Sequence, residues 1–162
     1  MNYHNITHDD MSNGDGLRVV LWLAGCEHKC DGCQNPITWK ADGGLKFNDK
    51  AKFEIFKELE KEYIAGITFS GGDPLHENNV EGVLKLIKEI RQKFPNKTVW
   101  LYTGYRMEEL TGVRKEVAHS CDVVVDGKFI KELADVNYPW AGSTNQKVWR
   151  FEHERSTYGK SK

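Results

Sequence analysis

The sequence predicts an α/β fold, an open, partial βα barrel with a mostly parallel sheet. Short apolar runs rich in β-branched residues alternate along the chain with segments whose apolar residues recur at helical spacing. This alternation is typical of right-handed βαβ units, which produce parallel strands. The chain has 162 residues, whereas a closed (β/α)8 barrel typically needs about 250. We therefore expect a barrel that stays open on one side, formed by a single domain over residues 1–162.

The first third of the chain predicts one strand and one helix. Residues 1–16 are polar and end in a turn-forming sequence, Asn13-Gly14-Asp15-Gly16, so we expect a turn-rich entry to the first core strand. Residues 17–24 are mostly apolar, as in a strand that is covered on both faces. Asn48 can cap a helix. The apolar residues that recur at helical spacing in this helix are Phe53, Phe56, Leu59 and Tyr63.

The remaining chain continues the alternation. Residues 67–70 read as a strand that ends in Gly71-Gly72-Asp73-Pro74. Asn78 and Glu81 resemble a capping box at the start of a second helix. Further apolar runs predict strands at 98–103, 122–125 and 147–151, and residues 152–162 read as a solvated tail. A third helix between the first two of these strands is marked by Met107, Leu110, Val113 and Val117.

The charge balance and the hydropathy pattern exclude two classes of partner. The 23 lysines and arginines nearly cancel the 24 aspartates and glutamates, so the chain lacks the positive charge that nucleic acids or anionic membranes attract. No apolar run approaches the ~18 residues of a spanning helix, and the N-terminus lacks the features of a signal peptide. We therefore expect a cytoplasmic protein. In that reducing compartment, clustered cysteines more often bind metal or act in catalysis than form disulfides.

Three of the four cysteines follow the first predicted strand directly, with the spacing C-x3-C-x2-C: Cys26, Cys30 and Cys33. A structural zinc site and an electron-transfer cubane both normally take four protein ligands. Three thiolates can instead hold three irons of a 4Fe-4S cluster and leave the fourth iron for a substrate. The amine and carboxylate of S-adenosylmethionine suit such an iron. An electron from the reduced cluster would break its carbon–sulfur bond and leave a 5'-deoxyadenosyl radical.

Further candidate site residues follow the other predicted strands directly. The carboxyl ends of parallel strands meet at one edge of a sheet, so the cysteine loop (residues 26–33) should lie beside Gly72, Asp73, Thr103 and Asp126. A glycine at position 72 lets the backbone approach a ligand closely, because no Cβ stands in the way. We therefore expect a cofactor site along this edge.

These motifs resemble those of a known superfamily. The CX3CX2C loop followed by Ser-Gly-Gly-Asp-Pro resembles the radical S-adenosylmethionine superfamily, which implies that the partial barrel is of that type. Further segments are similar to the activating proteins of anaerobic ribonucleoside-triphosphate reductases, namely M-N-Y-H, N-G-D-G-L-R, S-G-G-D-P-L-H, W-L-Y-T-G-Y, V-V-V-D-G-K-F and G-S-T-N-Q. This resemblance implies that the chain installs a glycyl radical on the large subunit of the reductase. Reduced flavodoxin or a similar protein would supply electrons, and a homodimer or a heterotetramer with the reductase would be compatible with this role.

The resemblance also implies residue roles. Three residues would hold the cluster, namely Cys26, Cys30 and Cys33. The carbonyl of Gly72 would receive the methionyl amine of the cofactor. The full expected cofactor-binding set is Gly32, Cys33, Gln34, Gly72, Asp73, Thr103 and Asp126. Two positions depart from the family pattern, since Gln34 stands where an aromatic residue is usual and Ala141 where arginine is usual.

Three alternatives stay open at this point. The same chemistry serves activating enzymes of other glycyl-radical enzymes, such as pyruvate formate-lyase. A zinc-stabilised binding module would need His28 or His119 to complete the three thiolates. An electron carrier would need Cys121 as its fourth cluster ligand, although Cys121 opens a predicted strand and reads as a small buried residue.

Overall fold

The computed structural model describes residues 1–33 and 36–153, and these form a mixed α/β fold around one seven-stranded sheet. The strand order is β3-β1-β2-β4-β5-β6-β7. The central strands are parallel: β2 (Leu17–Leu23), β4 (Ile64–Gly71), β5 (Thr98–Tyr102) and β6 (Val123–Asp126). Antiparallel strands flank them: β1 (Asn2–Asp10), β3 (Leu45–Lys46) and β7 (Lys147–Arg150). The α/β class and the open sheet are confirmed, while the superfamily barrel type stays a prediction.

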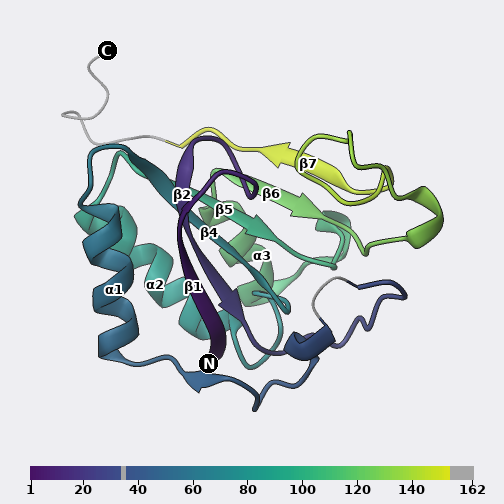
Figure 1. Ribbon diagram of the computed structural model, residues 1–162, viewed down its shortest axis with the longest axis horizontal. Helices are drawn as coiled ribbons and strands as arrows, with labels where there is room; N and C mark the ends of the chain where they lie inside the picture. Colours follow the sequence, from purple (N-terminus) through teal and green to yellow (C-terminus); the bar gives the residue numbers. More distant parts are fainter. Residues whose placement is uncertain (34–35, 154–162) are drawn as a thin grey trace.

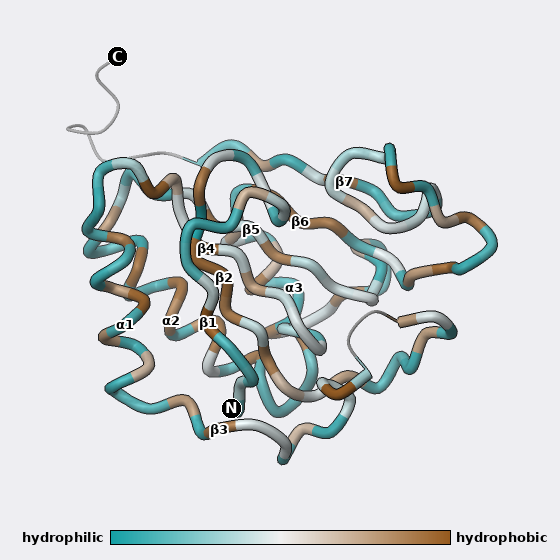
Figure 2. The backbone as a smooth tube through the Cα atoms, viewed as in Figure 1, coloured by the Kyte–Doolittle hydropathy of each residue, from teal (hydrophilic) through white to brown (hydrophobic). Residues whose placement is uncertain are grey.

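Within the described chain, three α-helices pack on one face of the sheet (Figure 1): α1 (Asp49–Leu59), α2 (Val80–Lys93) and α3 (Gly112–Ser120). The main core lies between helices and sheet, and alternate strand residues supply it, among them Leu21, Phe69, Leu101 and Val124. Figure 2 shows the central strands as largely hydrophobic segments inside the fold. None of the described helices combines the length and apolar character that crossing a bilayer requires.

The opposite face of the sheet holds a smaller apolar cluster and a buried arginine. Trp100 packs there with Val123 and Val125, and Trp140 covers them. Arg18 is fully buried beside this cluster and donates hydrogen bonds to residues of β4 and β5. Burial lowers the pKa of its guanidinium to about 10. Arg18 therefore ties together the amino ends of three parallel strands, at the edge opposite the cysteine loop.

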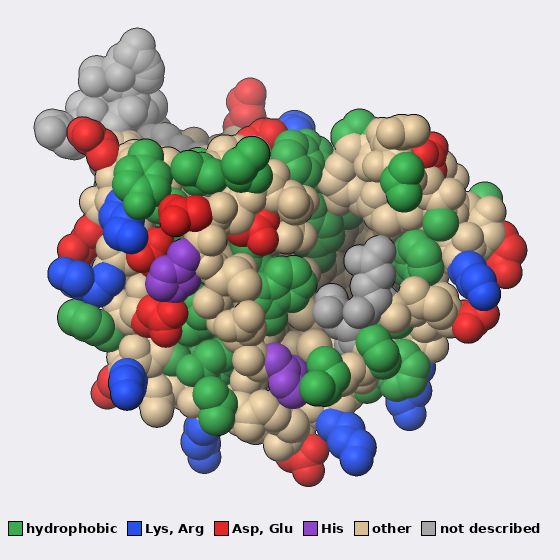
Figure 3. All heavy atoms as spheres, viewed as in Figure 1, with side chains coloured by type: hydrophobic (Ala, Val, Ile, Leu, Met, Phe, Trp, Pro, Cys, Tyr) green, Lys and Arg blue, Asp and Glu red, His purple; other side chains and the backbone are tan. Residues whose placement is uncertain are grey.

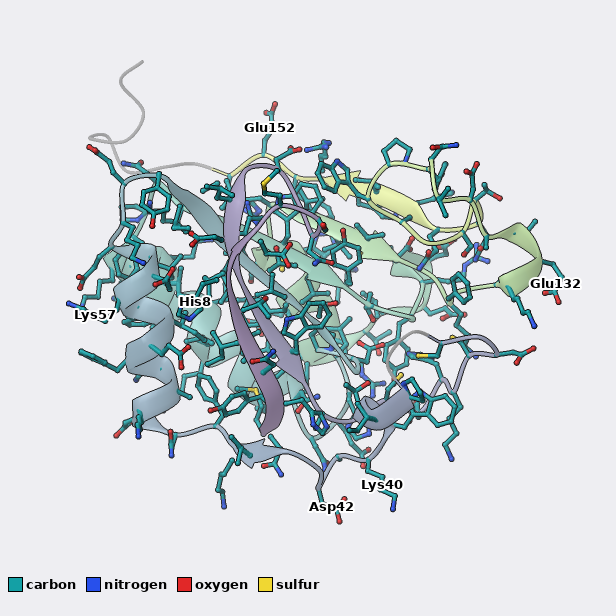
Figure 4. All side chains as sticks on the ribbon, in the orientation of Figure 1. His8, Lys40, Asp42, Lys57, Glu132 and Glu152 are labelled. Atoms are coloured by element: carbon teal, nitrogen blue, oxygen red, sulfur yellow. The ribbon has the colours of Figure 1, made fainter. Side chains whose placement is uncertain are left out.

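The entry segment of residues 1–16 contains a strand that its polar sequence did not predict, and its turn-forming end follows that strand. β1 pairs antiparallel with β2, and Ile6 is its one buried residue. His8 points toward α1 (Figure 4), where its Nε2 lies 2.7 Å from Oε2 of Glu54. Because ladder hydrogen bonds and polar contacts hold β1, its sequence carries little of the apolar pattern that marks a core strand.

The helix after Asn48 forms as predicted, but its buried face differs. Oδ1 of Asn48 accepts a hydrogen bond from the backbone N–H of Ala51 at 3.0 Å, which confirms the cap. Phe53 is 64% exposed, and Tyr63 lies beyond the helix and is 56% exposed, so neither belongs to the core face as predicted. Leu59 is buried and Phe56 packs against the core, as predicted. The other apolar residues of the buried face are Ala51 and Ile55, which precede Leu59 at i, i+4 spacing.

The next two helices begin later than predicted. α2 starts at Val80, and the predicted capping box of Asn78 and Glu81 is wrong, because Asn79 occupies the cap position without a side-chain cap bond. The Asn79 amide instead donates to the carbonyls of Ala24 and Asp73 at 2.8 and 2.9 Å. The predicted third helix is divided by two extended residues, Leu110 and Thr111, into the 3-10 turn η2 (Met107–Glu109) and α3.

Candidate functional site

The loops after β2, β4, β5 and β6 meet at one edge of the sheet, as the sequence predicts. Backbone hydrogen bonds join them directly. The N–H groups of Gly72 and Asp73 donate to the carbonyls of Leu23 and Gly25, both at 2.7 Å. The N–H of Thr103 donates to the carbonyl of Val125 at 3.0 Å. The edge is therefore a continuous rim, which the strand ends position.

The cysteine loop carries three partly exposed thiols on this rim, those of Cys26, Cys30 and Cys33, and none of them is in a disulfide. The N–H of Cys26 donates to the carbonyl of Trp39 at 3.1 Å, which ties the loop to the 3-10 helix η1 (Pro36–Trp39). Burial raises the pKa of the Cys26 thiol to about 11. Across residues 1–33 and 36–153, no three His, Cys, Asp or Glu side chains are gathered closely enough to hold a metal ion. The loop thus supplies three thiols without bringing their sulfurs to one point.

The glycines after β4 allow the rim backbones to pack tightly. Gly71 has φ +98°, which L side chains rarely adopt. A Cβ at Gly72 would lie 2.5 Å from the carbonyl oxygen of Gly25 and 2.9 Å from that of Thr38. The sequence predicts that Gly72 admits a ligand, and the structure shows that it admits the backbone on either side of the cysteine loop, at Gly25 and Thr38. A side chain at position 72 would push these loops apart.

The Asp73 carboxylate joins three of the rim loops. Asp73 is 1% exposed, and Oδ1 accepts hydrogen bonds from Thr103 Oγ1 at 2.8 Å and from the N–H of Leu75 at 2.9 Å. Oδ2 is 2.9 Å from the N–H of Gly104 and 2.7 Å from His28 Nε2. Asp73 and Thr103 were predicted as cofactor contacts, and the structure shows that they bond to each other.

His28, which the sequence indicates only as a candidate zinc ligand, is a buried part of the rim. Its side chain is 5% exposed, and its ring packs edge-on against that of Tyr105 with centroids 4.5 Å apart. The Tyr105 hydroxyl donates to Glu27 Oε2 at 2.6 Å, and the Arg114 guanidinium lies 4.4 Å from the Tyr105 ring. Burial and this hydrogen bond raise the pKa of Tyr105. No spacing rule connects His28 to residues this far along the chain, so only the fold reveals the contact.

The last rim loop follows β6 and faces a pocket of about 340 Å³ that Gly104, Arg106 and Lys128 help to line. Asp126 also lines it, is 4% exposed, and accepts a hydrogen bond from the N–H of Met107 at 2.8 Å. Figure 3 shows this side of the molecule hollowed between the β6–β7 region and the cysteine loop.

Two further positions complete the predicted set. A Cβ at Gly32, which has φ +77°, would lie 3.4 Å from the Phe129 ring, so the segment after β6 lies against the cysteine loop. Gln34, the other predicted contact, lies outside the described residues.

Two of the residues considered as a fourth protein ligand, Cys121 and His119, lie far from the cysteine loop. Cys121 is fully buried at the amino end of β6, and its Sγ donates to the carbonyl of Val117 at 3.3 Å. A strand of four residues separates it from the rim, a length of roughly 13 Å. His119 lies at the same far edge against Phe151. His28 lies on the rim, where its Nε2 bonds to Asp73. The rim offers three thiols on one loop, which is the number that a 4Fe-4S cluster with one iron free of protein ligands would need.

Known proteins resemble this chain over nearly its whole length. A family model described as a 4Fe-4S single cluster domain matches residues 12–149. Three relatives are called anaerobic ribonucleoside-triphosphate reductase-activating protein. The one from Escherichia coli K12 is 42% identical over 150 residues, which cover 91% of this chain and 97% of that protein. The one from bacteriophage T4 is 42% identical over 149 residues, with coverages of 92% and 94%.

The relative from Haemophilus influenzae is 40% identical over 154 residues, which cover 94% of this chain and 99% of that protein. The matched regions include the cysteine loop and every strand that bears a rim loop. The chain therefore belongs to the family of anaerobic ribonucleoside-triphosphate reductase-activating proteins and contains a 4Fe-4S single cluster domain.

Proposed function

We propose that this protein activates an anaerobic ribonucleoside-triphosphate reductase by reductive cleavage of S-adenosylmethionine. The observation that carries the proposal is the rim loop with three thiols outside any disulfide, while the fourth cysteine is buried at the other edge of the sheet. A bound 4Fe-4S cluster supplies the electron that breaks the carbon–sulfur bond of S-adenosylmethionine, and a 5'-deoxyadenosyl radical results. The radical takes a hydrogen atom from a glycine of the reductase.

The cysteine loop and the glycines after β4 have separate tasks in this proposal. Cys26, Cys30 and Cys33 bind three irons, which leaves one iron for the amine and carboxylate of the methionyl group. The Gly72 carbonyl receives the methionyl amine. The support for this assignment is the position of Gly72, whose N–H bonds to the last residue of β2, immediately before the cysteine loop.

The remaining rim residues position the cofactor. Asp73 and Thr103 fix the geometry of the loops through their buried hydrogen bonds. Asp126 lines the pocket at the ends of β5 and β6, where the nucleoside part of the cofactor would lie. Gly32 and Gln34 complete the set as backbone contacts beside the cluster.

The reductase large subunit is the proposed partner because the relatives are named for its activation. The same names favour it over pyruvate formate-lyase. Reduced flavodoxin or a similar carrier supplies the electron, and a homodimer or a heterotetramer with the reductase is the proposed assembly. We place the protein in the cytoplasm, because a reducing compartment keeps the three thiols available for iron.

The experiment that tests this function measures cleavage of the cofactor. Anaerobically reconstituted protein, reduced with dithionite, is incubated with S-adenosylmethionine, and chromatography quantifies 5'-deoxyadenosine and methionine. We expect both products in equal amounts. A fully loaded and reduced cluster that produces neither would contradict the proposal, whereas a zinc-binding module would be colourless and unaffected by dithionite.

A further inference from the structure

The cysteine loop is tied to the rim by a buried contact that the proposed chemistry does not use. His28 lies between the first two cluster cysteines, yet its side chain is 5% exposed and turns away from solvent. Its Nε2 is 2.7 Å from Oδ2 of Asp73. Asp73 is itself fixed by Leu75, Thr103 and Gly104. The middle of the loop is therefore attached to a framework that contains no cluster ligand.

The surroundings of His28 are shaped to receive its ring. A Cβ at Gly104 would lie 2.5 Å from Cδ2 of His28, so glycine at this position leaves the space that the imidazole fills. Tyr105 packs against the ring and is held in turn by Glu27 and Arg114. Two adjacent loop residues, Glu27 and His28, are thus anchored by the same segment after β5.

We propose that His28 is a positioning residue, which holds the cysteine loop against residues 71–74 before any cluster binds. A loop ordered in advance loses less conformational entropy when it captures its ligand. The inference rests on the proposed function only in that the same loop binds the cluster. Its test uses cluster-free protein, so its failure would leave the S-adenosylmethionine cleavage result untouched.

The test compares two substitutions in the full-length, cluster-free chain by amide hydrogen exchange. H28Q keeps an N–H donor at the position of Nε2, whereas H28F keeps a ring against Tyr105 and removes the donor. We expect exchange across residues 25–33 to be about tenfold faster in H28F, a typical effect of losing a hydrogen bond to a buried charge. H28Q should exchange at nearly the wild-type rate. Initial iron uptake should be slowest in H28F, because its loop must be ordered during capture.

A matched control is H119F, which makes the same replacement at a histidine near the opposite edge of the sheet. It should leave exchange across residues 25–33 unchanged. Wild-type exchange in H28F would overturn the proposal, and so would equal acceleration in H28Q and H28F, because the donor would then be irrelevant. Equal acceleration of α2 and β4 in H28F would also overturn it, since His28 would then support the fold as a whole.

Discussion

Cys26, Cys30 and Cys33 are the residues on which the proposed activity depends most directly. They share one loop, are free of disulfides and lie on the rim, whereas Cys121 is buried at the far edge. Burial keeps the Cys121 thiol protonated and inaccessible. The four cysteines therefore belong to two different environments, and substitutions should separate them.

Replacing any one of the three loop cysteines by alanine should abolish cluster binding, because each variant removes a thiolate from a set with none to spare. Iron content and visible absorption after anaerobic reconstitution measure the loss, and S-adenosylmethionine cleavage should fall to background. C121A is the control and should retain both. A cluster that persists in one of the loop variants would show that another residue binds iron.

Cys121 should make the unfolding free energy sensitive to alkaline pH. Burial raises its pKa in the folded protein above the ordinary thiol value of about 8.5. The contribution of Cys121 to the unfolding free energy is fully present below the pKa of the unfolded thiol. It is lost as pH rises above that pKa, because the unfolded chain then releases a proton that the folded chain retains. Urea unfolding at pH 8, 9 and 10 should show a steeper decline for wild type than for C121A, by at most about 1.4 kcal/mol per pH unit. Parallel declines would contradict this.

The substitution G72A should disrupt the rim. The added Cβ would lie 2.5 Å from the Gly25 carbonyl oxygen, so backbone must move, at a typical cost of about 1–3 kcal/mol. Urea unfolding and iron content should both decrease. G82A is the matched control, since Gly82 lies in α2 and its Cβ would meet the flexible side chain of Met1. Equal losses in the two variants would argue against a specific role for Gly72.

At the scale of the elements, sequence patterns located those parts whose stability comes from burial. The central parallel strands and the α2 face were predictable because apolar residues recur at the period of each structure. β1 was not, because its neighbours and its hydrogen bonds, rather than buried side chains, determine its conformation. In α1 the aromatic residues were predicted to form most of the buried face, yet the smaller Ala51 and Ile55 lie on the core side.

The site shows the same division. The cysteine spacing and the order of strands and helices sufficed to predict one rim with three thiols. The bond from His28 to Asp73 spans 45 residues and has no local signal. Asn79 likewise looks like an ordinary helix start, although its amide joins the loops after β2 and β4. Contacts of this kind depend on the register of the whole sheet, which short-range patterns do not determine.

The helix caps offer a prediction at this scale. N48A should lower the unfolding free energy by about 1 kcal/mol, because the Asn48 side chain caps α1 through the N–H of Ala51. N78A should change it by less than about 0.5 kcal/mol, since the exposed Asn78 makes no capping bond. Urea unfolding measures both. A larger decrease of the unfolding free energy for N78A than for N48A would indicate that Asn78 caps α2, contrary to the structure.

At the scale of the whole molecule, the open sheet suits a protein whose substrate belongs to another protein. Helices cover one face, and the rim with the cysteine loop lies at the carboxyl edge of the parallel strands (Figure 1). The sheet is not closed into a barrel, and the thiols of the rim are partly exposed, so a polypeptide can approach them. The relatives share this length almost completely, so the same single fold would serve all of them.

The most direct test of the central claim is electron paramagnetic resonance of the reductase after activation. Reconstituted, reduced protein is mixed with S-adenosylmethionine and the reductase large subunit, prepared once with ordinary glycine and once with α-deuterated glycine. We predict a doublet that collapses to a single line in the deuterated sample, with cofactor cleavage in the same reaction. No doublet in the presence of a loaded, reduced cluster, or a signal that deuteration does not change, would contradict the account.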